Sequence, residues 1–136
     1  MPATERWLPD ANTILRYLLD DHPELSVRAG VFWEAVREGS RNAFLREGVL
    51  LECVYVLQRF YKVPRPAIAS KLRGLLAYKG LSSAEGDLLH ASLALYGENN
   101  LDYVDCLLAA SAARGEGQVF TFDEGLRMVV ARGSSS

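Results

Sequence analysis

Four carboxylates stand where packing of a hydrophobic core does not explain them. Asp10 and Asp123 each follow a short apolar run and precede a helical pattern. Glu52 is the only charged residue in the apolar segment 48–57, and Asp105 is followed at once by Cys-Leu-Leu-Ala-Ala. A carboxylate in so apolar a setting is rarely buried without a partner, so Glu52 either meets an arginine or faces a metal ion or cleft. Asp10 and Asp123 could instead be helix N-caps, a role that Asp fills well.

Carboxylates gathered in one cleft would favour metal-dependent hydrolysis. They repel one another, and a divalent cation relieves that repulsion. Hard oxygen ligands suit Mg²⁺ or Mn²⁺, and such an ion can activate a bound water and neutralise charge on a phosphodiester. The only histidines are His22 and His90, and neither lies in a motif, which disfavours a Ser-His-Asp mechanism or a histidine-based zinc site.

Asp102 is a further candidate ligand, because it lies three residues before Asp105 and would share its helix face. It could equally be the N-cap of that helix, which is the interpretation that the spacing slightly favours. A phosphoaspartyl phosphatase centred on Asp10 is a remoter possibility, and Asn12, where such an enzyme would have a second Asp, weakens it.

The elements that must position these acids alternate along the chain. Short runs that could be strands lie at 6–9, 42–45, 80–82 and 118–122, and helical patterns at about 10–19, 23–37, 50–60, 66–78, 83–96, 102–114 and 123–130. Alternation without a hairpin signal predicts an α/β fold with a short parallel sheet and right-handed crossovers. Ligands bind at the carboxyl edge of such sheets, so we expect Asp10, Glu52 and Asp105 to converge there.

Composition fits one globular domain. The chain has 136 residues, of which 49% are hydrophobic, and we expect residues 1–132 to form the domain and 133–136 a disordered tail. The start carries no signal pattern and no apolar stretch is long enough to span a bilayer, so a soluble cytoplasmic protein is expected, without membrane contact. Cys53 and Cys106 lack metal or disulfide spacing and are predicted to be buried thiols.

A basic stretch follows the Glu52 helix. Residues 53–84 contain no Asp or Glu, and aromatic residues are interleaved with the bases there. The net charge of −2 argues mildly against nucleic acid, but this local distribution argues for an RNA-backbone path. A solvated helical hairpin and a protein-binding surface remain alternatives. The candidate RNA-binding residues are Arg59, Lys62, Arg65, Lys71 and Arg73.

Four segments together resemble the successive acidic motifs of the PIN domain, and most closely those of the VapC toxins of bacterial toxin–antitoxin pairs. They are Leu-Pro-Asp-Ala-Asn-Thr-Ile-Leu at 8–15, Leu-Leu-Glu-Cys-Val-Tyr-Val-Leu at 50–57, Asp-Tyr-Val-Asp-Cys-Leu-Leu-Ala-Ala at 102–110 and Thr-Phe-Asp at 121–123. The resemblance covers about residues 5–130. No single motif is strong, but four in this order are together specific.

The resemblance implies a single-domain α/β/α sandwich and Mg²⁺- or Mn²⁺-dependent endoribonuclease activity on an RNA substrate. It also implies a homodimer and a cognate antitoxin. The sequence departs from the family pattern at two positions beside the acids, so the residues that support the acids there are not predicted. Ala11 stands where the family often has Thr, and Arg46-Glu47 where a Ser or Thr commonly precedes the Glu-bearing helix. By position, the resemblance implies metal-binding acids at Asp10, Glu52 and Asp105, a more variable fourth acid at Asp123, and supporting polar residues at Asn12 and Thr121.

Two other functions fit the same residues. A nuclease specific for DNA or for a nucleic-acid structure would use the same chemistry, and assays on RNA and DNA of matched sequence separate it. A non-catalytic PIN-like binding module would keep the fold alone, which the intact set of acids disfavours.

Overall fold

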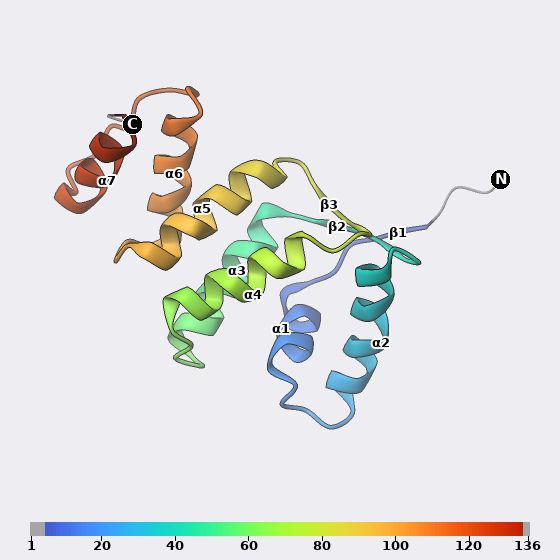
Figure 1. The fold of residues 1–136 in the computed structure, drawn as a ribbon. Helices are drawn as coiled ribbons and strands as arrows, with labels where there is room; N and C mark the ends of the chain where they lie inside the picture. Colours follow the sequence, from blue (N-terminus) through green and yellow to red (C-terminus); the bar gives the residue numbers. More distant parts are fainter. Residues whose placement is uncertain (1–4, 135–136) are drawn as a thin grey trace.

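The computed structural model describes residues 5–134 and shows short strands between longer helices (Figure 1). In chain order the elements are β1 (Arg6–Trp7), α1 (Ala11–Leu19), α2 (Leu25–Glu38), β2 (Asn42–Leu45), α3 (Glu47–Arg59), α4 (Arg65–Leu76), β3 (Leu81–Ser83), α5 (Gly86–Glu98), α6 (Tyr103–Ala113) and α7 (Glu124–Ser134). No helix in the described range is both long and apolar enough to cross a membrane.

The sheet has the parallel topology that the alternating pattern predicts. Its order is β1-β2-β3, with Trp7 opposite Ala43 and Ala43 opposite Leu81. The central strand β2 is the buried one, since Ala43 and Leu45 are both almost fully covered. The predicted fold class is therefore confirmed: one α/β/α domain, rich in helix, around a short parallel sheet.

The segment 118–122 differs from prediction, because it is not a strand. Phe120 and Phe122 are 90% and 89% exposed, although the residue pattern is typical of a half-buried strand. A strand is stable only beside another strand, and Figure 1 shows the loop between α6 and α7 at the opposite end of the molecule from β1. The predicted tail also differs in part: α7 continues through 133–134, and residues 135–136 lie outside the described part of the chain.

The core forms where the helices meet the sheet and one another. Trp33 of α2 is fully buried, stacks on Tyr17 at 6.2 Å and meets Phe32 edge-on at 5.2 Å. Cys53 and Cys106 are free thiols and fully buried, as predicted from their apolar surroundings. These contacts fix α1, α2, α3 and α6, the helices on or beside which the candidate acids lie.

Gly80 lies where three backbone segments approach one another closely. Its N–H donates to the carbonyl of Val36 at 2.8 Å, and its carbonyl accepts from the N–H of Ala43 at 2.9 Å. A Cβ at this position would lie 2.0 Å from the carbonyl oxygen of Arg41. Glycine is therefore required where α2, β2 and the start of β3 meet.

We expect Gly80→Ala to lower the free energy of unfolding by about 1–3 kcal/mol, because the added methyl group must displace backbone. The matched control is Gly74→Ala in α4, where nothing lies within 4 Å of the added Cβ. That change should raise stability by about 0.5–1 kcal/mol through helix propensity. Urea denaturation of both variants measures the difference, and equal stabilities would contradict the close approach.

Candidate active site

Asp10 lies at the carboxyl end of β1 and begins α1. Its Oδ1 accepts the backbone N–H of Thr13 at 3.0 Å, and the Thr13 hydroxyl donates back to the Asp10 carbonyl at 2.9 Å. The N-cap interpretation is therefore correct for Asp10, but it occupies only one carboxylate oxygen. The side chain is exposed at the N-terminus of α1.

Asp10 also lines a cavity of about 490 Å³ between β1, α1 and α2. Its lining combines apolar side chains with Asn12, Thr13 and two arginines. Arg16 is bound to Asp21 at 3.0 Å and to the Tyr61 hydroxyl at 2.8 Å. Arg16 lay outside every motif, because only the packing of α1 against α2 brings it to this cavity.

Glu52 is exposed on α3, with its neighbour Cys53 turned into the core. Among the described residues it has no hydrogen bond and no ion pair, so the alternative that it meets an arginine is wrong. Burial raises the pKa of the Cys53 thiol to about 12, and the carboxylates of Glu52 and Asp10 contribute to that rise. Both carboxylates therefore lie close enough to the Cys53 thiol to influence its pKa.

Asp105 is half-buried on the first turn of α6. Burial raises its pKa above the usual range, and the nearby charges of Asp102 and Asp123 raise it further. No described residue donates a hydrogen bond to it. Asp105 is thus an unpaired carboxylate within a second acidic group that is formed by α6 and the start of α7.

The capping roles differ from the interpretation that the sequence slightly favoured, in which Asp102 was the N-cap. Asp102 occupies the N-cap position of α6, yet its side chain makes no capping hydrogen bond. The Oδ1 atom of Asp123 accepts the backbone N–H of Leu126 at 2.9 Å, and its own N–H donates to the Thr121 hydroxyl at 2.9 Å. Thr121 therefore does hold Asp123 in place, as a supporting polar residue would.

The pKa of Asp105 responds to Asp102 and Asp123, whereas Asp10 and Glu52 influence the pKa of Cys53. Within residues 5–134, no three Asp, Glu, His or Cys side chains lie close enough to hold a metal ion together. The oxygen donors are of the type that Mg²⁺ prefers, although no three of them lie together in the described residues. The expected convergence of Asp10 and Glu52 with Asp105 is not seen in the single chain.

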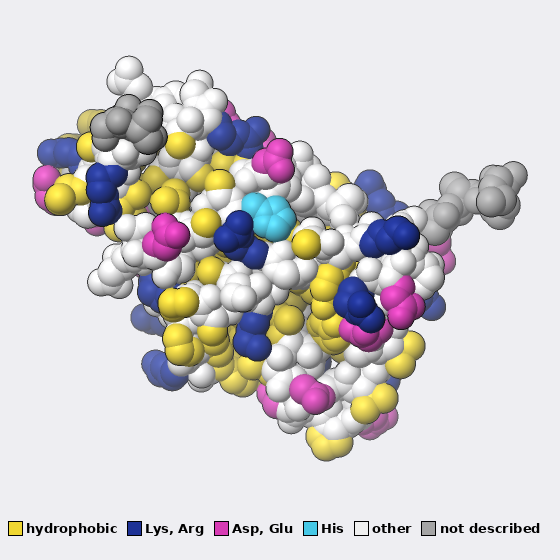
Figure 2. Space-filling view, in the orientation of Figure 1, with side chains coloured by type: hydrophobic (Ala, Val, Ile, Leu, Met, Phe, Trp, Pro, Cys, Tyr) yellow, Lys and Arg dark blue, Asp and Glu magenta, His cyan; other side chains and the backbone are white. Residues whose placement is uncertain are grey.

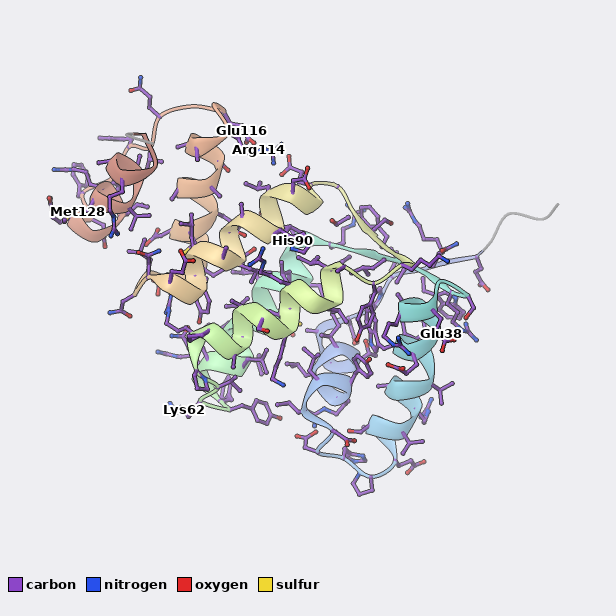
Figure 3. All side chains as sticks on the ribbon, viewed as in Figure 1. Glu38, Lys62, His90, Arg114, Glu116 and Met128 are labelled. Atoms are coloured by element: carbon purple, nitrogen blue, oxygen red, sulfur yellow. The ribbon has the colours of Figure 1, made fainter. Side chains whose placement is uncertain are left out.

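The basic stretch lies on α3, α4 and the turn between them. Figure 3 places Lys62 at that turn, and around it Figure 2 shows Lys and Arg beside hydrophobic side chains and no acidic group. Arg59, Lys62, Lys71 and Arg73 are exposed. Arg65 differs, because it stacks 3.8 Å above the Tyr96 ring and donates to the carbonyls of Tyr96 and Leu101. Its role is structural, and it leaves the candidate RNA-binding set.

A profile of the PIN domain matches residues 7–131. The chain belongs to the PIN domain family. No curated protein and no solved structure matches it. PIN domains are typically metal-dependent nucleases, so this chain has a nuclease fold.

The capping geometry predicts different stabilities for two alanine variants. Asp123→Ala removes the acceptor for the Leu126 N–H and should lower the free energy of unfolding by about 1 kcal/mol. Asp102→Ala removes no capping bond and should change it by less than about 0.5 kcal/mol. Asp123→Asn is the control, since Asn caps as well as Asp. Chemical denaturation measures all three, and a larger destabilisation by Asp102→Ala would contradict the assignment.

Proposed function

We propose that the protein is a divalent-metal-dependent endoribonuclease and that it acts as the toxin of a toxin–antitoxin pair. The observation that supports this most is a set of unpaired carboxylates in a PIN domain chain. Among the described residues, none of Asp10, Glu52, Asp105 and Asp123 forms an ion pair. Acids held without counterions are poised for a cation supplied from solution.

The fold orients two of these acids. Asp10 and Asp123 each stand at a helix N-terminus. In both, one oxygen accepts a backbone N–H, which fixes the rotamer and leaves the second oxygen for a ligand. A divalent ion bound by such oxygens would supply an activated water and neutralise charge on the phosphodiester.

RNA is the proposed substrate because of the basic stretch beside the Glu52 helix. Arg59 lies over the Tyr55 ring at 5.6 Å, and Tyr55 itself is 52% exposed, so one surface offers a cation and an aromatic face. Backbone phosphates and unstacked bases of single-stranded RNA need those two contacts. The toxin role rests on the likeness of the four acidic motifs to VapC toxins, with a cognate antitoxin as the proposed partner.

The test is cleavage of RNA and of DNA of matched sequence, with Mg²⁺, with Mn²⁺ and with a chelator. We expect metal-dependent cleavage of the RNA, and loss of cleavage in Asp105→Asn and in Asp123→Asn. Asp105→Asn should remain folded and melt at a higher temperature without metal. The raised pKa shows that its charge is unfavourable in the folded state above that pKa, and Asn removes this penalty.

The outcomes separate the competing functions. Cleavage of the DNA alone would show that DNA and not RNA is the substrate. The absence of both metal binding and cleavage would support a non-catalytic binding module. Asp102→Asn should reduce the rate less than Asp123→Asn does, and the opposite order would reverse their roles. For the toxin role, expression in a bacterial host should arrest growth for the wild-type chain and not for Asp105→Asn.

Replacing Arg59, Lys62 and Lys71 together with Gln should weaken RNA binding for all sequences. It should also reduce the slope of log affinity against log salt by about 0.7 for each phosphate that the variant no longer neutralises. The control is Arg37→Gln on α2, where the arginine pairs with Glu34 at 2.8 Å. Titrations of RNA binding at several salt concentrations measure the slope. Equal slopes in both variants would exclude the basic stretch as the RNA-binding surface.

A further inference from the structure

The cavity of about 490 Å³ between β1, α1 and α2 has the composition of a small-molecule binding site. Such sites usually measure about 300–1,000 Å³, and apolar and aromatic side chains line them together with a few polar groups that orient the ligand. Here β1 and α2 contribute the aromatic side chains of Trp7 and Phe32, while α1 contributes polar side chains, among them Asn12. The cavity therefore suits a ligand that has a flat apolar part and a polar part.

Trp7 forms a fixed aromatic wall of this cavity. Its backbone pairs with Ala43 of the buried strand β2. Arg41 lies over the indole at 5.3 Å, and Phe32 meets it edge-on at 6.0 Å. Arg41 does not line the cavity, and the Trp7 side chain remains 40% exposed. A held, partly exposed indole offers a surface on which an unstacked nucleic-acid base can stack.

Two arginines line the same cavity, and one of them is free to bind an anion. Arg16 of α1 is held by Asp21 at 3.0 Å and by the Tyr61 hydroxyl at 2.8 Å, so a neighbouring carboxylate already balances its charge. Arg28 of α2 is exposed and forms no ion pair among the described residues. Phosphate is an anion that the planar donors of arginine match well, which makes Arg28 the candidate phosphate contact.

The cavity also connects the candidate acid Asp10 with the basic stretch. Asp10 lines it at the start of α1. One turn further along α1, Arg16 reaches the Tyr61 hydroxyl, and Tyr61 precedes Lys62 at the turn between α3 and α4. An RNA strand that runs from the exposed bases of that stretch to Asp10 therefore passes the mouth of the cavity.

We propose that this cavity binds one nucleotide of the RNA substrate, with the base against Trp7 and the phosphate at Arg28. The proposal rests on the proposed function and deepens it, because it makes the substrate single-stranded: a base must leave its stack to reach the indole. Asn12 is exposed and presents a donor and an acceptor to the edge of such a base. An apolar segment of a protein would instead leave Arg28 and Asn12 without partners.

The first experiment titrates the intact chain with AMP in the presence of a chelator and follows tryptophan fluorescence. Trp7 and Trp33 are the two tryptophans of the chain, and Trp33 is fully buried, so quenching by a stacked base comes from Trp7. We expect AMP to quench the wild type and not Trp7→Leu, in which the emission of Trp33 reports that the fold is intact. Absence of quenching at millimolar AMP, or quenching that persists in Trp7→Leu, would overturn the proposal.

The second experiment separates the two parts of the nucleotide by calorimetry. AMP should bind about tenfold more tightly than adenosine or ribose 5-phosphate, because each of these lacks one of the two contacts. Arg28→Gln should lower the affinity for AMP to that for adenosine and leave adenosine binding unchanged. The matched control is Arg37→Gln on the same helix, since Arg37 pairs with Glu34 at 2.8 Å and does not line the cavity. Equal losses in the two arginine variants, or binding of toluene and not of AMP, would reject the nucleotide as the occupant.

The third experiment compares binding with cleavage. Trp7→Leu should raise the KM for single-stranded RNA about tenfold and affect kcat less, because the stacking contact is present in the bound substrate as well as in the transition state. Quenching by AMP in a protein that cleaves no nucleic acid would retain the nucleotide site and reject the nuclease. Cleavage of RNA with neither quenching by AMP nor a change of KM in Trp7→Leu would retain the nuclease and reject the nucleotide site.

Discussion

The parallel pairing of β2 with both β1 and β3 is the interaction on which the rest of the structure depends. It sets the ends of β1 and β2 side by side, and the helices that follow these strands begin at the same edge. Asp10 is the N-cap of one of them, and Glu52 lies in the other. Because Gly80 admits β3 so close to the end of α2, the sheet tolerates little change in spacing.

Like-charge repulsion acts on Asp105 in addition to burial. Each candidate acid is exposed or half-buried, none has an arginine partner among the described residues, and the pKa of Asp105 is raised by its two acidic neighbours as well as by burial. Gathering all of them in one chain without a cation would add to that unfavourable energy.

Much of the fold could be predicted because its signals are local. The helical periodicity, the alternation of strands with helices and the apolar surroundings of Cys53 and Cys106 each depend on a few neighbouring residues. The N-cap at Asp10 was an open alternative for the same reason. The caps of α6 and α7 were harder to rank, since Asp102 and Asp123 stand in similar positions and only the path of the backbone decides which carboxylate reaches an amide.

The sequence by itself determined the parallel α/β architecture, the types of the candidate ligands and the β-forming character of 118–122, because residue type and spacing along the chain encode these. Only the tertiary structure decided that Arg65 is bound to backbone carbonyls of Tyr96 and Leu101, that Glu52 has no arginine, and that 118–122 lies away from β1. Each of these depends on contacts between residues far apart in the chain. A strand-forming segment in particular becomes a strand only where another strand's free edge can bind it.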